Sequence, residues 1–284
     1  MSVFSDPEII ALLKDQFIPA AVDNHHIEKQ KDAEGDFYRK VASHQGEYIC
    51  TPEGKLLAST NTHSASHLKG LMLKALKDYP PPGPAAAAGG APDARFQRAL
   101  PEGGLVVKVT TKVLAGYEAG KNRNAEIYQG SLGRDNLRVE PEEARALAGG
   151  KVPDSLKKRI ASYHMVDNTR GEPPWWRRDE IRTMELEIGK DGIVKGTVHL
   201  ETAKGDRGFV GDVLGFIEGK EGKVTRFDLV AKGQAWGAGR YNGGQPPGKY
   251  PLAFAFTQSE AKTEADRLLP QGACRGNLAG YFAP

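Results

Sequence analysis

The stretch that decides the fold is residues 182–233, RTMELEIGKDGIVKGTVHLETAKGDRGFVGDVLGFIEGKEGKVTRFDLVAKG. It contains four β-type runs, 182–188, 193–202, 208–218 and 223–233, joined by the glycine-containing turns 189–192, 203–206 and 219–222. Runs at this spacing with such turns predict an antiparallel meander. Further β-type runs at 104–114 and 251–256, and helices at 141–148 and 153–163, complete the predicted elements. We therefore expect a β-rich domain over residues 95–284 that curls into a barrel or a sandwich.

A proline- and glycine-rich segment separates this domain from the residues before it. Residues 80–94 read PPPGPAAAAGGAPDA, in which the prolines lack backbone donors and the alanines and glycines offer little to bury. The segment predicts a semi-rigid linker. Residues 1–79 then form a module of their own, and two compact units suit a chain of 284 residues.

The first module shows a regular order of predicted elements. A helix capped by Ser5 or Asp6 is followed by a buried strand at 17–22, a helix at 31–42, a hairpin at 47–59 and an amphipathic helix at 66–79. The stretches that match known proteins are SDPE at 5–8, FIP at 17–19, Asp23 and GEYICTPEGK at 46–55. Over residues 3–79 they resemble the thioredoxin-like superfamily, which implies a thioredoxin-like α/β module.

The resemblance does not extend to the redox site of that superfamily. The superfamily's first strand and its Cys-x-x-Cys motif would lie upstream of Met1, and its cis-proline position falls at Gln45. Dithiol exchange needs an attacking thiolate of low pKa and a second thiol to resolve the mixed disulfide. We therefore expect a degenerate module without oxidoreductase activity. The β-rich half resembles only uncharacterised bacterial proteins, which supplies no mechanism. The predicted fold class is α+β.

Composition excludes several classes of protein. The net charge of +3 comes from 39 basic and 36 acidic side chains, so we expect no nucleic-acid partner. No apolar run is long enough to span a membrane. The two cysteines, Cys50 and Cys274, lie in different predicted domains, which argues against a disulfide framework. The expected location is the cytoplasm by default, with export if an upstream signal has been removed.

The most unusual segment is 163–179, YHMVDNTRGEPPWWRRD. Its candidate ligand-binding residues are His164, Asp167, Arg170, Trp175, Trp176 and Arg177. Indoles beside guanidinium groups suit stacking and the capture of carboxylate or phosphate. The alternative is that the two tryptophans plug one end of a barrel while the arginines form surface ion pairs.

Two other stretches supply further candidates. The glycine-rich stretch 233–244 lacks the Lys-Ser/Thr ending of a P-loop, and we interpret it as a bulged loop that places Trp236, Arg240 and Tyr241 near a barrel mouth. In the run 197–201, His199 shares one face with Thr197 and Glu201 by alternation. That face lines a cavity if it points inward and is solvated if it points outward, as antiparallel sheets favour.

Weaker candidates lie in the first module. Cys50 is either a lone reactive thiol or a small buried hydrophobe. His25 and His26, together with His199, are candidate metal ligands, although their spacing matches no closed zinc pattern and a solvated loop is the alternative for the pair.

We conclude that the sequence favours a non-catalytic protein that binds a small molecule or a protein, neither of which it identifies. The alternative is an enzyme, either a thiol-dependent redox protein using Cys50 or a metal-dependent or acid-base activity in the β-rich domain. The sequence assigns no cofactor.

Overall fold

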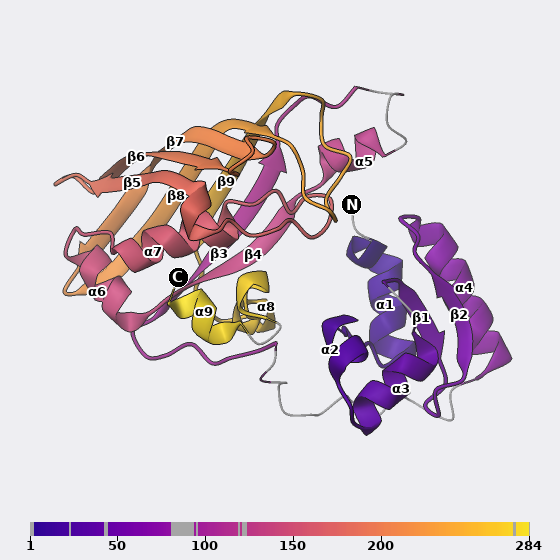
Figure 1. Cartoon of the computed structure of the whole chain (residues 1–284). Coiled ribbons are helices and arrows are strands. Elements are labelled where there is room, and N and C mark those ends of the chain that lie inside the picture. The colour runs from indigo at the N-terminus through magenta and orange to yellow at the C-terminus, as the bar shows by residue number, and fades with distance from the viewer. Residues whose placement is uncertain are drawn as a thin grey trace. The chain divides into compact units, whose positions relative to one another are not determined.

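The computed structural model describes residues 3–22, 24–42, 45–80, 94, 96–118, 120, 124–274 and 277–283. The chain divides into two compact units, Met1–Ala91 and Pro92–Pro284 (Figure 1). The predicted linker over 80–94 lies outside the described residues except for Pro80 and Ala94. Each unit is described separately below.

The first unit combines short helices with one hairpin. Its elements are η1 (Val3–Ser5), α1 (Pro7–Gln16), α2 (Asn24–Lys29), α3 (Ala33–Val41), β1 (Glu47–Cys50), β2 (Leu56–Thr60) and α4 (Ala65–Asp78). The predicted cap of the first helix is confirmed, because the Asp6 carboxylate accepts hydrogen bonds from the amides of Glu8 and Ile9 at 2.9 and 3.3 Å. The predicted hairpin is also confirmed, since β1 and β2 pair antiparallel. A small core of Val3, Ile9, Leu68 and Met72 holds the unit together.

Two predictions for this unit are wrong. Residues 17–22 are not a strand, and Ile18 is 69% exposed, because β1 and β2 pair only with each other in the described residues and offer this run no neighbour. His25 and His26 lie in helix α2 rather than in an extended loop. The thioredoxin-like fold of the unit stays a prediction.

The second unit is built on one large antiparallel sheet. Its strands are β3 (Leu105–Val113), β4 (Gly133–Val139), β5 (Ile181–Ile188), β6 (Ile193–Glu201), β7 (Gly208–Lys220), β8 (Lys223–Trp236) and β9 (Lys249–Gln258). Its helices are α5 (Ala125–Gly130), α6 (Pro141–Ala148), α7 (Asp154–Arg159), η2 (Ile160–His164), η3 (Arg178–Glu180), α8 (Glu264–Arg267), η4 (Gln271–Ala273) and α9 (Leu278–Phe282). The strand order is β4-β3-β9-β8-β7-β6-β5, which confirms the predicted antiparallel meander.

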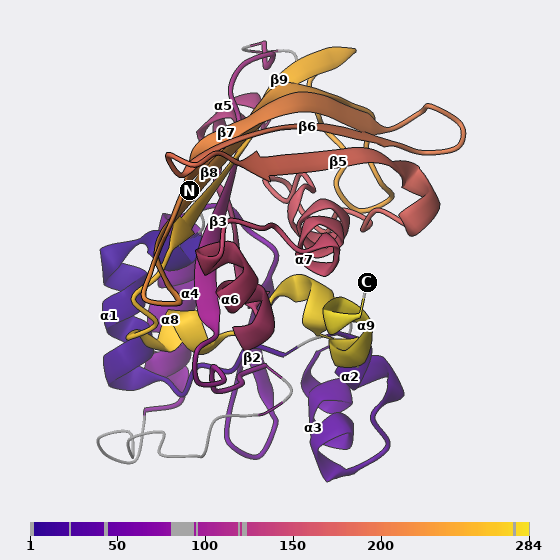
Figure 2. The same cartoon turned by 90° about the vertical axis from the view of Figure 1, so that its left-hand side faces the viewer.

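The expected closed barrel is wrong, because β4 and β5 end the sheet without pairing to each other. The sheet is strongly twisted, with α6 and α7 lying on one side of it (Figures 1 and 2). Helix η2 contacts both β4 and β5 and so takes the place that a closing strand pair would occupy. Gly211 on β7 and Gly233 on β8 are in register, and a Cβ at Gly233 would overlap the carbonyl oxygen of Val210. The two glycines therefore let the strands approach closely where the sheet bends.

The sheet has a buried inner face and a solvated outer face. Leu200, Phe209, Ala235 and Tyr250 stand side by side in register, and each is at most 4% exposed. They belong to one core that includes residues of α6, α7 and η2. Because side chains alternate along a strand, the neighbouring residues of β6–β9 point to the outer face.

A buried charge pair joins the helices of this core to the segment 278–282. The Arg159 guanidinium is 1% exposed and lies 2.5 Å from a carboxylate oxygen of Glu143. It also donates to the carbonyl oxygens of Tyr281 and Phe282 at 3.0 and 3.1 Å. Ser155 donates to the second carboxylate oxygen of Glu143 at 2.6 Å. The pair is thus nearly fully hydrogen-bonded, the condition under which a buried ion pair is tolerated.

We predict that Arg159→Met destabilises the second unit by about 3–5 kcal/mol, because it leaves the Glu143 carboxylate buried without its cation. Urea unfolding followed by tryptophan fluorescence measures this, since all three tryptophans lie in that unit. Arg145→Met is the matched control, because Arg145 is exposed and lies 3.9 Å from Glu142. Equal losses in the two variants would contradict the role of burial.

Candidate functional site

An open depression of about 800 Å³ lies at one end of the sheet. It is formed where β3, β6, β8 and β9 begin or end and by the loops that follow them. Its lining residues are Gly116, Tyr117, Glu118, Glu201, Gly205, Trp236, Gly237, Gln245, Pro246, Pro247, Gly248 and Lys249. A concave site that combines aromatic rings with a few charged groups is the usual form of a small-molecule site.

The Trp236 indole forms one wall of the depression and rests on the outer face of the sheet. Glu201, Gly208, Trp236 and Lys249 stand side by side in register, one residue beyond the buried row. A Cβ at Gly208 would overlap the indole, so the glycine is what allows the ring to lie there. The indole N–H donates to the carbonyl oxygen of Gly205 at 2.9 Å. The Lys249 ammonium lies 4.6 Å from the ring centroid, a cation–π contact.

Tyr117 supplies the second aromatic ring and is held from behind by a buried ion pair. Arg170 donates to the Tyr117 hydroxyl at 3.0 Å and lies 2.6 Å from an oxygen of Asp167. The same carboxylate oxygen accepts a hydrogen bond from the Tyr250 hydroxyl at 3.0 Å. The Arg170 side chain is wholly buried. Two of the predicted candidates, Asp167 and Arg170, therefore lie beneath the depression and do not line it.

The electrostatics behind Tyr117 keep the two phenols neutral and the Arg170 guanidinium charged. Burial lowers the pKa of Arg170, but the Asp167 carboxylate together with the Tyr250 and Tyr117 hydroxyls more than offsets this and holds the pKa above its usual value. Burial raises the pKa of Tyr117 and, with the help of Asp167, that of Tyr250. Both phenols are therefore neutral at pH 7, and the Arg170 guanidinium is charged.

The depression carries charges of both signs. Glu118 and Glu201 contribute carboxylates, and Lys249 contributes an ammonium. Glu201 also lies 3.3 Å from the His199 imidazole. His199 and Thr197 point outward, whereas Val198 and Leu200 are at most 1% exposed, so this face of β6 is the solvated one.

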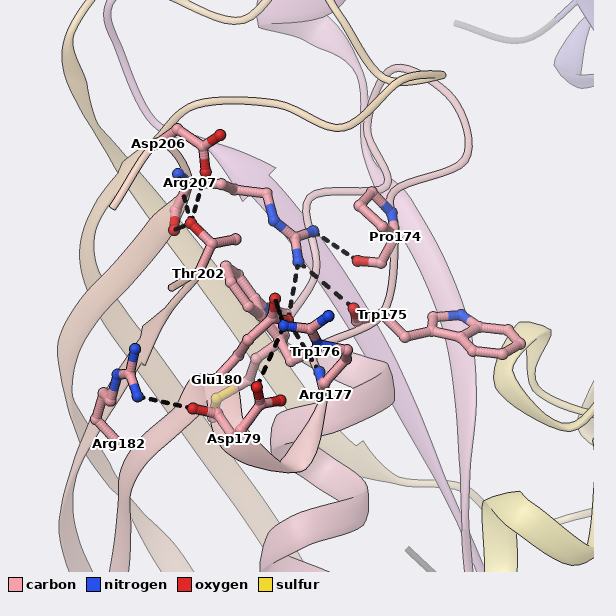
Figure 3. A network of polar contacts seen from close by, with 11 residues as sticks. Pro174, Trp175, Trp176, Arg177, Asp179, Glu180, Arg182, Thr202, Asp206 and Arg207 are labelled. Carbon is pink, nitrogen blue, oxygen red and sulfur yellow. Dashed lines mark hydrogen bonds and ion pairs between the residues drawn. The ribbon is translucent and has the colours of Figure 1, made fainter. Parts of the chain in front are cut away.

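The adjacent tryptophans 175 and 176 do not form one surface. The Trp176 ring is packed in the core, and its N–H donates to the carbonyl oxygen of Met165 at 2.7 Å. Trp175 is half-buried against the edge of the Tyr163 ring and points away from the Arg207 guanidinium (Figure 3). Trp176 thus lies on the inner face of the sheet and Trp236 on the outer face, which excludes a shared mouth.

Arg207 ties the tryptophan segment to β7. Its guanidinium lies 3.7 Å from the Trp176 ring centroid and donates to the carbonyl oxygens of Pro174 and Trp175 at 2.6 and 3.4 Å (Figure 3). Burial lowers the pKa of Arg207, partly offset by Glu180. This cluster is a structural support for the segment 174–180, and sequence analysis did not identify Arg207 as its anchor.

The other predicted residues lie apart from the depression. The Arg177 side chain is 65% exposed and pairs with Asp179 and Glu180. Tyr241 is 65% exposed, with the Arg240 guanidinium 5.2 Å from its ring centroid. His164 is buried, and its Nε2 lies 2.7 Å from the Tyr281 hydroxyl.

No metal site or membrane span emerges from these residues. Within the described parts of the chain, no three His, Cys, Asp or Glu side chains are grouped so as to hold a metal ion. None of the described helices has the length and apolar character needed to cross a bilayer. No protein-family model, curated protein or solved structure matches the chain.

The residues that sequence analysis missed come from two loops. Tyr117 and Glu118 follow β3, and the residues 245–248, QPPG, lead into Lys249, the first residue of β9. The antiparallel pairing of β3 with β9 brings these loops together, since Val113 is in register with Leu252. The sequence does contain one indication of this site, because the two prolines beside a glycine at 246–248 are typical of a loop with a defined conformation.

We predict that Cys50 alkylates slowly at neutral pH, because burial raises the pKa of its thiol and so lowers its thiolate fraction. Iodoacetamide modification of the Cys274→Ser chain measures this, with an unstructured cysteine peptide as the control. The rate should still be rising with pH where that of the peptide has levelled off. A Cys50 rate above that of the peptide at pH 7 would instead favour the thiol-dependent enzyme.

Proposed function

We propose that the second unit is a non-catalytic binding domain whose ligand is a small organic molecule held in the depression between Trp236 and Tyr117. The observation that carries the proposal is that both rings are fixed from behind. Trp236 is held by Gly208 and by the Gly205 carbonyl, and Tyr117 by the buried Arg170–Asp167 pair. Rings ordered in advance lose little conformational entropy when a ligand binds.

The lining chemistry describes the ligand. It has a flat or cyclic apolar surface that contacts the indole, and polar groups that reach Glu118, Glu201 and Lys249. A positive group on the ligand is accommodated by the Glu118 and Glu201 carboxylates. The volume of about 800 Å³ suits a ligand of metabolite size rather than a folded protein.

The first unit enters the proposal as a thioredoxin-like module. The confirmed hairpin and the capped helix α1 support this assignment. The raised pKa of Cys50 supports a structural rather than a nucleophilic role for that thiol.

The proposal is tested by calorimetric titration of the full chain with methyl β-glucoside, choline and N-acetyl-tryptophanamide as probes, one of which should bind. Trp236→Ala should weaken that binding tenfold or more, because truncating an aromatic anchor costs roughly 2 kcal/mol. Trp175→Ala is the matched control and should leave affinity unchanged, since Trp175 does not line the depression. Binding that survives Trp236→Ala, or no binding by any of the three probes, would refute the proposal.

A second variant tests the support of the indole rather than the indole itself. Gly208→Ala should displace the Trp236 ring and weaken the same binding, because the added Cβ overlaps the indole. Gly243→Ala is its control, since nothing lies near the position of its Cβ. Calorimetric affinities of the two variants provide the measurement, and equal values would show that the ring position does not matter.

The enzyme alternative rests on the His199–Glu201 pair, which lies beside the depression. His199→Gln separates the two functions, because it removes the acid-base pair and leaves the lining residues in place. Unchanged probe affinity in this variant is the result expected for a binding domain.

A further inference from the structure

The outer face of the sheet carries apolar side chains where an antiparallel sheet ordinarily carries polar ones. They come from three adjacent strands, β7, β8 and β9. The members of this outer apolar patch are Val210, Leu214, Phe216, Val230, Pro251, Ala253 and Ala255. Leu214 is 59% exposed, Val230 47% and Val210 43%.

Apart from Val210, which Asp212 and Gln234 separate from the other members, the patch is continuous. Leu214, Val230 and Ala255 stand side by side in register across the three strands. A contiguous apolar surface of this kind marks an interaction site, whereas scattered exposed apolar residues do not. The patch therefore has the composition of a sheet face that packs against a second sheet, and one copy of this sheet provides no such partner.

The patch is distinct from the ligand depression. Its centre, at Leu214, lies six residues along β7 from Gly208, on which the Trp236 indole rests. At 3.4 Å per residue this separation is about 20 Å. A partner on the patch therefore has a role beyond the proposed ligand binding, and nothing in this inference rests on that proposal.

The charges around the patch identify the partner. Asp212 on β7 is in register with Lys232 on β8, and Glu218 is in register with Arg226. All four side chains are exposed. Consider a twofold axis that runs parallel to the strands between β7 and β8. It places each β7 residue over the β8 residue of the same row in a second copy of the chain.

This symmetry matches the chemistry at the two rows in the centre of the patch. Asp212 faces Lys232 of the second copy, and the reciprocal contact repeats it. Leu214 faces Val230 in the same way. At these two central rows an acidic side chain therefore meets a basic one and apolar side chains meet apolar ones, whereas in the flanking rows Val210 faces Gln234 and Phe216 faces Asp228. Two sheets packed face to face lie about 10 Å apart, a distance these side chains fill.

We propose that the chain forms a twofold homodimer through the outer apolar patch, with its axis parallel to the strands between β7 and β8. Sheets packed in this way cross at about 30°, so the contact is densest near Asp212, Leu214, Val230 and Lys232 and opens toward the strand ends. The depression around Trp236 lies at such an end and stays accessible.

The first test is the oligomeric state of the full chain in sedimentation velocity at micromolar concentration. The native chain should sediment as a dimer, and Leu214→Asp as a monomer with unchanged circular dichroism. Leu132→Asp is the matched control, because Leu132 is 48% exposed in the same unit and lies outside the patch. It should remain a dimer. A native chain that is monomeric at all concentrations would overturn the proposal, and so would a patch covered by the first unit of the same chain.

The second test fixes the axis. Asp212→Lys places two like-charged contacts in the dimer, and so does Lys232→Asp, so each variant alone should be monomeric. An equimolar mixture should return to a dimer, because in the mixed pair Lys at 212 faces Asp at 232 and Asp at 212 faces Lys at 232. A mixture that stays monomeric, or single variants that remain dimeric, would overturn the proposed geometry.

Discussion

The register in which β6, β7, β8 and β9 pair is the constraint on which the rest of the second unit depends. Because side chains alternate at every residue, this register places Phe209 in the core and Gly208 beneath the Trp236 indole. A slip of one residue in any of these strands would exchange the two faces. The buried core, the aromatic wall of the depression and the apolar outer patch are thus three results of one alignment.

The sequence could predict the strands of the meander because their alternation and turns are local signals. It could not predict whether the sheet closes. Closure depends on how far the sheet bends at Gly211 and Gly233 and on helix η2, which covers both free edges, and these are contacts between distant segments. Strand β4 was missed because its sequence, GRDNLRV, is largely polar. The apolar run 17–22 predicts a strand that the structure does not contain, because a run by itself does not show whether it has a pairing neighbour.

The site could be predicted only in part, because it too depends on contacts between distant segments. Trp236 was a candidate because of its place in a glycine-rich loop, but its partners Tyr117 and Lys249 come from segments more than 100 residues apart in the chain. The adjacent tryptophans 175 and 176 suggested a shared platform, yet neighbouring side chains in an extended segment diverge. Arg207 holds this segment by donating to backbone carbonyl oxygens, and a sequence motif of side chains does not reveal such contacts.

The buried Arg159 has a consequence for how the chain is made. Its guanidinium is completed by the carbonyl oxygen of Tyr281, 122 residues later. The ribosome must therefore synthesise most of the sheet before the Arg159 guanidinium can form all of its hydrogen bonds. Until the segment 278–282 emerges, the half-made unit carries an incompletely bonded cation at its centre and an open apolar face, which is the state that chaperones recognise. Folding of this unit in that sense waits for residues 278–282, and it is completed by a short helix rather than by any strand.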